Sequence, residues 1–207
     1  MNILVIFCHP SKKSYTFQIL EQIKAEIYKQ KHSVKVSDLY EMNFQSDMTE
    51  QEYEREAFSN FDNEIPNDVK IEHEKLDWAN SVIFLYPVWW SNCPAKLKGW
   101  FDRVYSVGYA YKNISGIKKM KKFNYGAVIC TAGYSNSQLN EMGIAQSMKT
   151  IMLKDKLGDR FNNKKMFILG GTLDINGVKD NHAEVIANII KEMSATSPNR
   201  VDGSASN

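Results

Sequence analysis

Short apolar segments alternate with segments of helical periodicity along most of this chain, and this alternation constrains its fold more than any other feature. The apolar segments are rich in Val, Ile and Phe and too short for core helices, which is typical of buried strands. The expected strands are residues 2–8, 34–39, 81–86, 125–131 and 166–169. Helical patterns between successive strands indicate βαβ units, so the sequence predicts an α/β fold with a doubly wound five-stranded parallel sheet.

The strand spacing also predicts how the sheet is ordered. Five strands of this kind fit the order 2-1-3-4-5 with helices on both faces. At 207 residues the chain is long enough for one well-cored domain. We expect this domain to span residues 1–193, with a last helix from about His182 to Met193. Residues 194–207 are rich in Ser, Asn and Ala, and we expect them to form a mobile tail.

The charge balance disfavours several classes of partner. A net charge of +2 from 26 basic and 24 acidic residues shows no bias toward nucleic acid or membranes, since a basic footprint must cluster on one face. The dense run Lys118, Lys119, Lys121 and Lys122 is interpreted as a solvated approach to a strand. Without a membrane-length apolar stretch or a signal-peptide pattern, we expect a cytoplasmic protein with no membrane insertion.

Several kinds of chemistry find no matching motif in the sequence. Cys8, Cys93 and Cys130 lack CxxC spacing, which disfavours a disulfide framework, a zinc site and an iron–sulfur cluster, so we expect no metal. The GxSxG turn of one large hydrolase class is missing, which disfavours a Ser-His-Asp hydrolase. A GxxxxGK[ST] loop is also missing, so nucleotide hydrolysis has no support.

An aromatic loop separates the third strand from the next helix. Pro87 is expected to end the strand, and Pro94 fits the first turn of the helix. Apolar residues then recur at helical spacing: Leu97, Trp100, Phe101 and Val104. Trp89 and Trp90 are adjacent, so in an extended loop one would face inward and the other would be exposed. The pattern is about equally consistent with two roles for these tryptophans, which are ordinary core packing and the binding of a ligand.

Two further loops are expected at neighbouring strand ends, where open α/β sheets bind ligands. Residues 9–16 offer hydroxyls, lysines and free helix amides to an anion, with Ser14 as the helix cap. Residues 131–134 offer backbone N–H groups beside small side chains, although Gly133 equally fits a structural turn. With residues 87–93, these loops match the phosphate and ring ends of a flavin nucleotide.

A long acidic and aromatic segment lies between the second and third strands. It runs from about residue 40 to residue 76, with a helical piece near residues 49–58. Excursions of this length in compact domains often have a function. We therefore expect this segment to cover the site or a neighbouring subunit.

Over roughly residues 2–193 the chain resembles the flavodoxin-like NAD(P)H:quinone oxidoreductase family. The resemblance is carried by three motifs, which are His9 with Ser14-Tyr15-Thr16, residues 37–44, and residues 87–104 ending in LKGWFDRV. It implies a flavodoxin-like fold and an NAD(P)H dehydrogenase (quinone). In such an enzyme, hydride passes from NAD(P)H through flavin N5 to quinones or to related nitro and azo acceptors. A homodimer is also implied, as is a flavin cofactor, with FAD favoured over FMN.

The resemblance assigns cofactor-binding roles to three groups of residues. These are His9, Ser14, Tyr15 and Thr16 at the phosphates, Pro87, Val88, Trp89 and Trp90 along the ring, and Thr131, Ala132 and Gly133 at the pyrimidine edge. The mammalian members have a Tyr and His pair after the fourth strand, whereas residues 137–145 contain neither type. Tyr134 is therefore the one catalytic candidate. A regulatory flavoprotein subunit of a potassium-efflux transporter is the alternative function, and a structural module with a vestigial site is a third.

Overall fold

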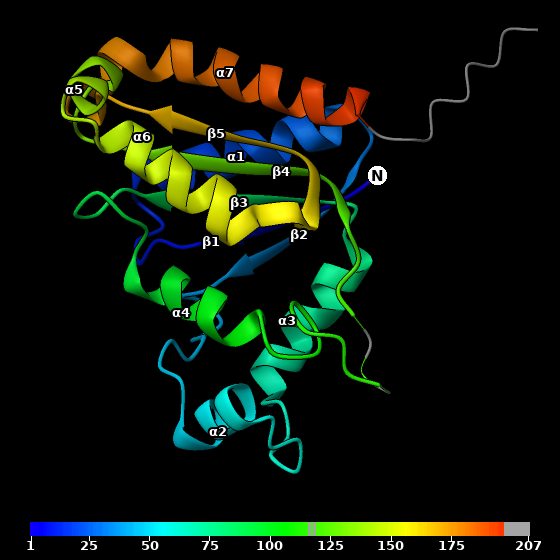
Figure 1. The fold of residues 1–207 in the computed structure, drawn as a ribbon. Helices are drawn as coiled ribbons and strands as arrows, with labels where there is room; N and C mark the ends of the chain where they lie inside the picture. The colour runs from blue at the N-terminus through cyan, green and yellow to red at the C-terminus, as the bar shows by residue number, and fades with distance from the viewer. Residues whose placement is uncertain (116, 118, 197–207) are drawn as a thin grey trace, which may run out of the picture.

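The computed structural model describes residues 1–115, 117 and 119–196. Five parallel strands form one sheet in the order β2-β1-β3-β4-β5, and helices cover both faces (Figure 1). The strands are β1 (Asn2–Phe7), β2 (Ser33–Asp38), β3 (Ser81–Pro87), β4 (Phe123–Thr131) and β5 (Phe161–Leu169). The predicted fold class and strand order are confirmed.

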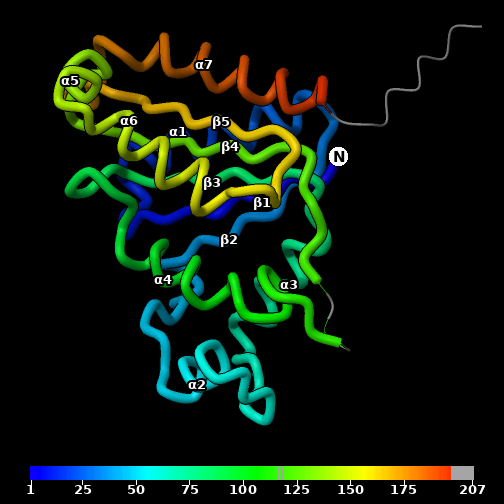
Figure 2. The backbone as a smooth tube through the Cα atoms, in the orientation of Figure 1, coloured from blue at the N-terminus to red at the C-terminus, as the bar shows by residue number. Residues whose placement is uncertain are grey.

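Two helical layers enclose the sheet (Figure 2). On one face α1 (Tyr15–Lys29) and α7 (Ile175–Ala195) pack together over the strands. The other face is covered by the helices α3 (Asn67–Trp78), α4 (Ala95–Val104), α6 (Ile144–Lys149) and the π-helix η1 (Thr150–Leu157). The remaining helices are α2 (Glu50–Phe58), α5 (Asn136–Glu141), η2 (Gly158–Arg160) and η3 (Thr172–Asp174). No helix in the described ranges is long and apolar enough to cross a bilayer.

The alternation of side chains along β1 explains why the sheet has two apolar faces. Ile3 and Val5 contribute to the core under α1 and α7, whereas Leu4 and Ile6 contribute to the core under α4. Successive residues of a strand point to opposite faces, so a central parallel strand must be apolar throughout. Every residue of β3 is buried in the same way.

Several predicted boundaries differ from the structure, most of them by one or two residues. Pro87 belongs to β3, where it pairs with Thr131, because the missing N–H of proline is tolerated at the end of a strand. The strand β5 begins at Phe161 rather than at Met166, since its polar first half lies at the sheet edge, where exposed side chains are allowed. The helix α7 begins at Ile175 rather than near His182.

The last helix extends into the segment that was predicted to be a mobile tail. The helix α7 continues through Ala195, so residues 194 and 195 are helical rather than part of a mobile tail. Ser194 is held there because its hydroxyl donates to Ile190 O, 2.8 Å away. The rest of the predicted tail, residues 197–207, lies outside the described residues, as does Lys118 of the basic run.

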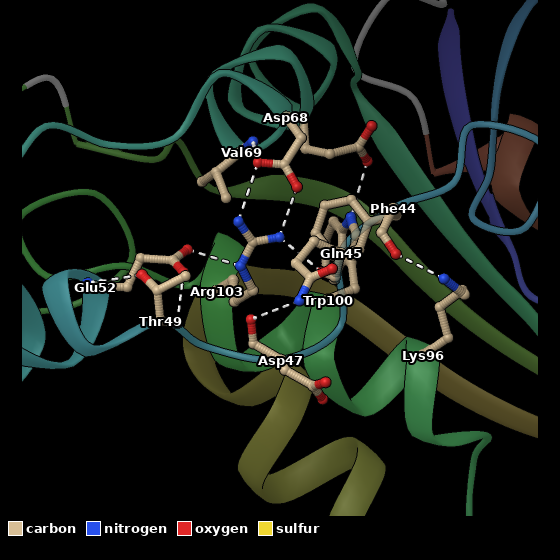
Figure 3. Close-up of polar contacts among 11 residues, drawn as sticks. Phe44, Gln45, Asp47, Thr49, Glu52, Asp68, Val69, Lys96, Trp100 and Arg103 are labelled. Carbon is tan, nitrogen blue, oxygen red and sulfur yellow. Dashed lines mark hydrogen bonds and ion pairs between the residues drawn. The ribbon is translucent and has the colours of Figure 1, made fainter.

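The long segment between β2 and β3 is docked on α4 through a buried ion-pair network (Figure 3). The Nε atom of Arg103 donates to Glu52 Oε1 at 2.7 Å, and Nη1 donates to Gln45 O at 2.6 Å. Nη1 and Nη2 of Arg103 also reach the two carboxylate oxygens of Asp68, at 2.6 and 3.0 Å. One guanidinium thus joins three parts of the long segment to a single helix.

Other residues of α4 also hold the long segment between β2 and β3 against this helix. Trp100 Nε1 donates to Glu72 Oε2 at 2.8 Å inside the core, and Lys96 Nζ donates to Phe44 O at 2.6 Å. At Gly99 a Cβ would lie 2.1 Å from Ser46 O, so only glycine lets this backbone approach. The motif LKGWFDRV therefore anchors the long segment.

Candidate functional site

Three loops meet at the carboxyl edge of the sheet, because they follow the adjacent strands β1, β3 and β4. Val88 N donates to Thr131 O at 2.8 Å, which joins the second loop to the end of β4. The hydroxyls of Thr16 and Thr131 are hydrogen-bonded at 2.8 Å and buried. The rings of His9 and Trp89 lie edge to face with centroids 6.1 Å apart. The three predicted loops thus lie side by side, and we call the region where they meet the crevice.

The start of α1 presents free backbone donors. The Ser14 hydroxyl accepts from Phe17 N at 3.1 Å, so Ser14 caps the helix as predicted. The N–H groups of Tyr15 and Thr16 have no hydrogen-bond partner in the described structure, as expected for the first turn of a helix. Their side chains face the core instead, where the Tyr15 hydroxyl lies 2.9 Å from His182 Nδ1. Only their backbones are therefore available to an anion.

His9 is held in one orientation beside this helix start. Ser11 N donates to His9 Nδ1 at 3.0 Å, and the same Nδ1 lies 3.1 Å from Ser11 O, so Ser11 fixes the orientation of the ring. Burial lowers the pKa of His9, so the ring is neutral near pH 7. Lys12 pairs with Glu41 at 2.8 Å, whereas Lys13 has no ion-pair partner in the described structure. The loop thus has an oriented imidazole and an unpaired cation in addition to the free amides.

The aromatic loop is a two-residue hairpin rather than an extended segment. Trp89 N donates to Asn92 O at 2.9 Å, and Asn92 N donates back to Trp89 O at 3.1 Å. Trp90 and Ser91 have φ values of +48° and +61°, the left-handed conformation that tight hairpin turns require. Trp89 is 42% exposed and Trp90 is fully exposed. The expectation that one indole faces inward is wrong, because the chain reverses over these two residues, and neither indole belongs to the core.

The third loop leaves two amides free. Ala132 N donates to Leu169 O at 3.0 Å, so the predicted Ala132 donor is used inside the sheet. The N–H groups of Gly133 and Tyr134 have no hydrogen-bond partner in the described structure. Gly133 does not have a positive φ, and a Cβ there would lie an ordinary 3.5 Å from Leu173. A structural turn therefore does not require glycine at this position.

A pocket of about 470 Å³ lies between the second and third loops. Its lining is mostly apolar and contains no charged side chain: Val88, Trp90, Ser91, Ala132, Gly133, Tyr134, Leu139, Met142, Ile144 and Leu173. Sequence reasoning missed the last four of these and Ser91. Helical spacing marks Leu139 and Met142 as possible neighbours, but only the packing of α5, α6 and η3 brings them to the crevice.

The three cysteines are not poised for chemistry. Burial raises the pKa of Cys8 to about 12 and that of Cys93 to about 11, which keeps both thiols protonated. Cys130 is fully buried and its pKa is raised for the same reason. In the part of the chain that the structure describes, no cluster of His, Cys, Asp and Glu could hold a metal ion.

The donors and the pocket fit a flavin nucleotide. Free amides at a helix start suit a phosphate, and the free amides of Gly133 and Tyr134 suit the oxygen and nitrogen acceptors of a pyrimidine edge. The apolar pocket, whose lining includes Gly133 and Tyr134, suits a flat ring. Fold and crevice together define a doubly wound α/β protein whose crevice lies at the carboxyl ends of its strands, where sheets of this kind bind ligands.

Comparison with known proteins gives the family. Residues 1–189 match the family described as "Flavodoxin-like fold", and the chain belongs to this family. A solved NAD(P)H:quinone oxidoreductase from Methanothermobacter marburgensis superposes with a TM-score of 0.86 at 37% identity, covering 94% of this chain and 97% of that one. The resemblance inferred from the three motifs is thereby confirmed.

Two curated relatives align over shorter stretches. An uncharacterized NAD(P)H oxidoreductase from Haemophilus influenzae is 33% identical over 162 residues, covering 74% of this chain and 75% of the relative. The "ribosyldihydronicotinamide dehydrogenase-like protein traD" from Penicillium crustosum is 38% identical over 128 residues, which is 54% of this chain but 46% of that protein. The match thus spans less than half of the fungal relative. These names support the expectation of an oxidoreductase.

Proposed function

We propose that the chain is a flavin-dependent NAD(P)H dehydrogenase (quinone). One observation supports this proposal most strongly. The free amides at the start of α1, the free amides of the loop after β4 and an uncharged apolar pocket all lie at the same edge of the sheet. When bound, the flavin would accept hydride from NAD(P)H at its N5 atom and deliver it to the acceptor. The names of the relatives support the same reaction.

The chain's own residues would supply binding and orientation. The amides of Tyr15 and Thr16, the His9 imidazole and the Lys13 cation would hold the phosphate end of the cofactor, whether FAD or FMN. The amides of Gly133 and Tyr134 would donate to the pyrimidine edge, where negative charge develops on reduction. These fixed dipoles need no rearrangement when the charge appears.

The pocket lining supports a planar and uncharged acceptor. Trp90 and Tyr134 present aromatic surface, and aliphatic side chains line the rest of the pocket. Such a surface can bind quinones, nitroaromatic compounds or azo compounds. Stacking on an aromatic side chain requires a planar acceptor but no particular functional group. We propose Tyr134 as the residue that hydrogen-bonds the acceptor, because it lines the pocket with its side chain 55% exposed.

We further propose a cytoplasmic homodimer with its interface around this crevice. Four large apolar side chains on the pocket rim are strongly exposed: Trp90 (100%), Leu173 (88%), Tyr134 (55%) and Met142 (49%). Clustered apolar residues rimming a site are typical of surfaces that a partner covers. Free cysteines suit a reducing compartment.

Three measurements on one purified sample test the proposal. We expect the purified protein, after incubation with flavin, to show a visible flavin spectrum that NAD(P)H bleaches without oxygen and that a quinone restores. Chromatography of the released cofactor distinguishes FAD from FMN, and sedimentation of the same sample gives the mass of the dimer. A protein that retains no flavin after reconstitution would contradict the central claim.

Replacing His9 by Ala is expected to weaken flavin binding by about 10- to 100-fold, because a hydrogen bond to a charged acceptor contributes roughly 1.5–3 kcal/mol. The measurement is quenching of flavin fluorescence on titration of the flavin-free protein. His9→Gln keeps an N–H donor and serves as the matched control, with a smaller loss expected. Unchanged affinity in His9→Ala would remove His9 from the phosphate site.

A further inference from the structure

A second pocket lies at the opposite end of the sheet from the flavin crevice. It has a volume of about 520 Å³ and is formed where β4 and β5 begin, from residues 119–122 and 158–160 with the end of η1. The nine residues of β4 separate it from the crevice by roughly 26 Å. No residue of this pocket lines the crevice.

The lining of this second pocket is strongly basic. Five cations surround it, and they come from three separate stretches of the chain: Lys119, Lys121, Lys122, Lys154 and Arg160. Two carboxylates, Asp155 and Asp159, share the lining, and Asp155 is already paired with Lys156 at 3.0 Å. Positive charge therefore exceeds negative charge locally, although the chain as a whole is nearly neutral.

Most of these cations are not used within the protein. Lys121 Nζ donates to Asp77 O at 2.6 Å, which fixes one wall of the pocket. Lys119, Lys122 and Lys154 have no ion-pair or hydrogen-bond partner among the described residues. Like charges held at the edge of one hollow repel each other, so an anion bound between them would relieve that repulsion.

Arg160 is held in a fixed position, and some of its N–H donors have no acceptor within the protein. Its guanidinium lies over the Tyr105 ring, 4.7 Å from the centroid, which fixes the plane of the fork. Nη1 makes one long hydrogen bond of 3.4 Å to Lys156 O, and the buried Nε has no acceptor. A fixed guanidinium with unused donors is the side chain best suited to a phosphate.

We propose that this pocket binds a small anion bearing two or more phosphate groups. The several cations suit multiple phosphates, and the volume lies in the range of small-molecule sites. A nucleic acid would instead need a basic surface that continues beyond one hollow. Lys119, Lys121 and Lys122 belong to the basic run that is interpreted from the sequence as a solvated approach to a strand, and in the structure these three lysines form one wall of this site.

Calorimetric titration of the flavin-loaded protein with inorganic pyrophosphate at low salt tests the proposal. We expect one saturable site, and at least tenfold weaker binding in the double variant Lys122→Gln, Lys154→Gln. The matched control is Lys179→Gln, Lys191→Gln, which removes the same charge from exposed positions on α7. Its binding should stay within about twofold of the wild-type value. All four substituted lysines are exposed, so thermal unfolding should be unchanged in both variants.

Three outcomes would overturn the site. The first is wild-type protein that binds flavin and is reduced by NAD(P)H but shows no saturable heat with pyrophosphate. The second is equal weakening in the test and control variants, which would mean a general charge effect. The third is release of flavin by pyrophosphate, which would place the anion in the crevice. Binding of pyrophosphate is measured as heat and not as turnover of a quinone, so the loss of this site would leave the proposed reductase activity unaffected.

Discussion

Replacing Arg103 by Met is expected to lower the free energy of unfolding by about 3–5 kcal/mol. The Arg103 side chain is 3% exposed, and its partners Glu52 and Asp68 are 7% and 31% exposed. Without the guanidinium, a nearly buried carboxylate at Glu52 and the carbonyl of Gln45 lose their donor. Removing one member of a buried ionic network costs more than the network contributes, because the remaining charges stay desolvated.

Denaturant unfolding at neutral pH measures this loss. Lys98→Ala is the matched control on the same helix, because Lys98 makes an exposed pair with Asp102 that contributes only a few tenths of a kcal/mol. Arg103→Lys should fall between the two, since lysine keeps the charge but cannot bridge three acceptors with a planar fork. A loss in Arg103→Met no greater than that in Lys98→Ala would show that the network is not what holds the long segment.

Replacing Gly99 by Ala is expected to destabilise the protein by about 3 kcal/mol, although alanine is the better helix former. The new Cβ would lie 2.1 Å from Ser46 O and 2.7 Å from the Ser46 carbonyl carbon. Both are backbone atoms, so relief requires α4 and the long segment to separate. Helix propensity returns only about 1 kcal/mol of this cost.

Thermal unfolding distinguishes the two opposing effects. A drop of roughly 10 °C in Tm is expected for a domain of this size. Gly133→Ala is the matched control in flavin-free protein, because its Cβ would meet Leu173 at an ordinary 3.5 Å without a positive φ. A higher Tm in Gly99→Ala would mean that helix propensity outweighs the contact and that the segment is loosely docked.

These two expectations concern the motif LKGWFDRV, whose residues hold the long segment in place. Gly99, Trp100 and Arg103 each contact the long segment between β2 and β3. That segment was expected to cover the site or a neighbouring subunit, and the structure docks it on α4. The motif still matters to the crevice, because α4 begins directly after the hairpin that carries Trp89 and Trp90.

The parallel sheet and its carboxyl edge could be predicted from the sequence alone. Apolar strands between helical patterns specify a parallel sheet, because a strand buried on both faces must be apolar throughout and a parallel connection needs a crossover. The order 2-1-3-4-5 then places the loops after β1, β3 and β4 side by side. Ser14 could be recognised as a cap because capping is local, depending on a side chain and an amide three residues later.

The hydrogen-bond donors that each loop residue leaves free for a ligand could not be predicted, because they depend on contacts between distant parts of the chain. Whether the amide of Ala132 or of Gly133 is free depends on Leu169 in another strand, which no local pattern near residue 132 reveals. The hairpin at Trp90 adopts positive φ without glycine, against local preference, so sequence reasoning read it as extended. Likewise, Lys122 and Arg160 share one pocket because β4 and β5 begin side by side. Backbone preferences act over a few residues, whereas packing joins residues far apart in the chain, and the donors and charges of both sites depend on packing.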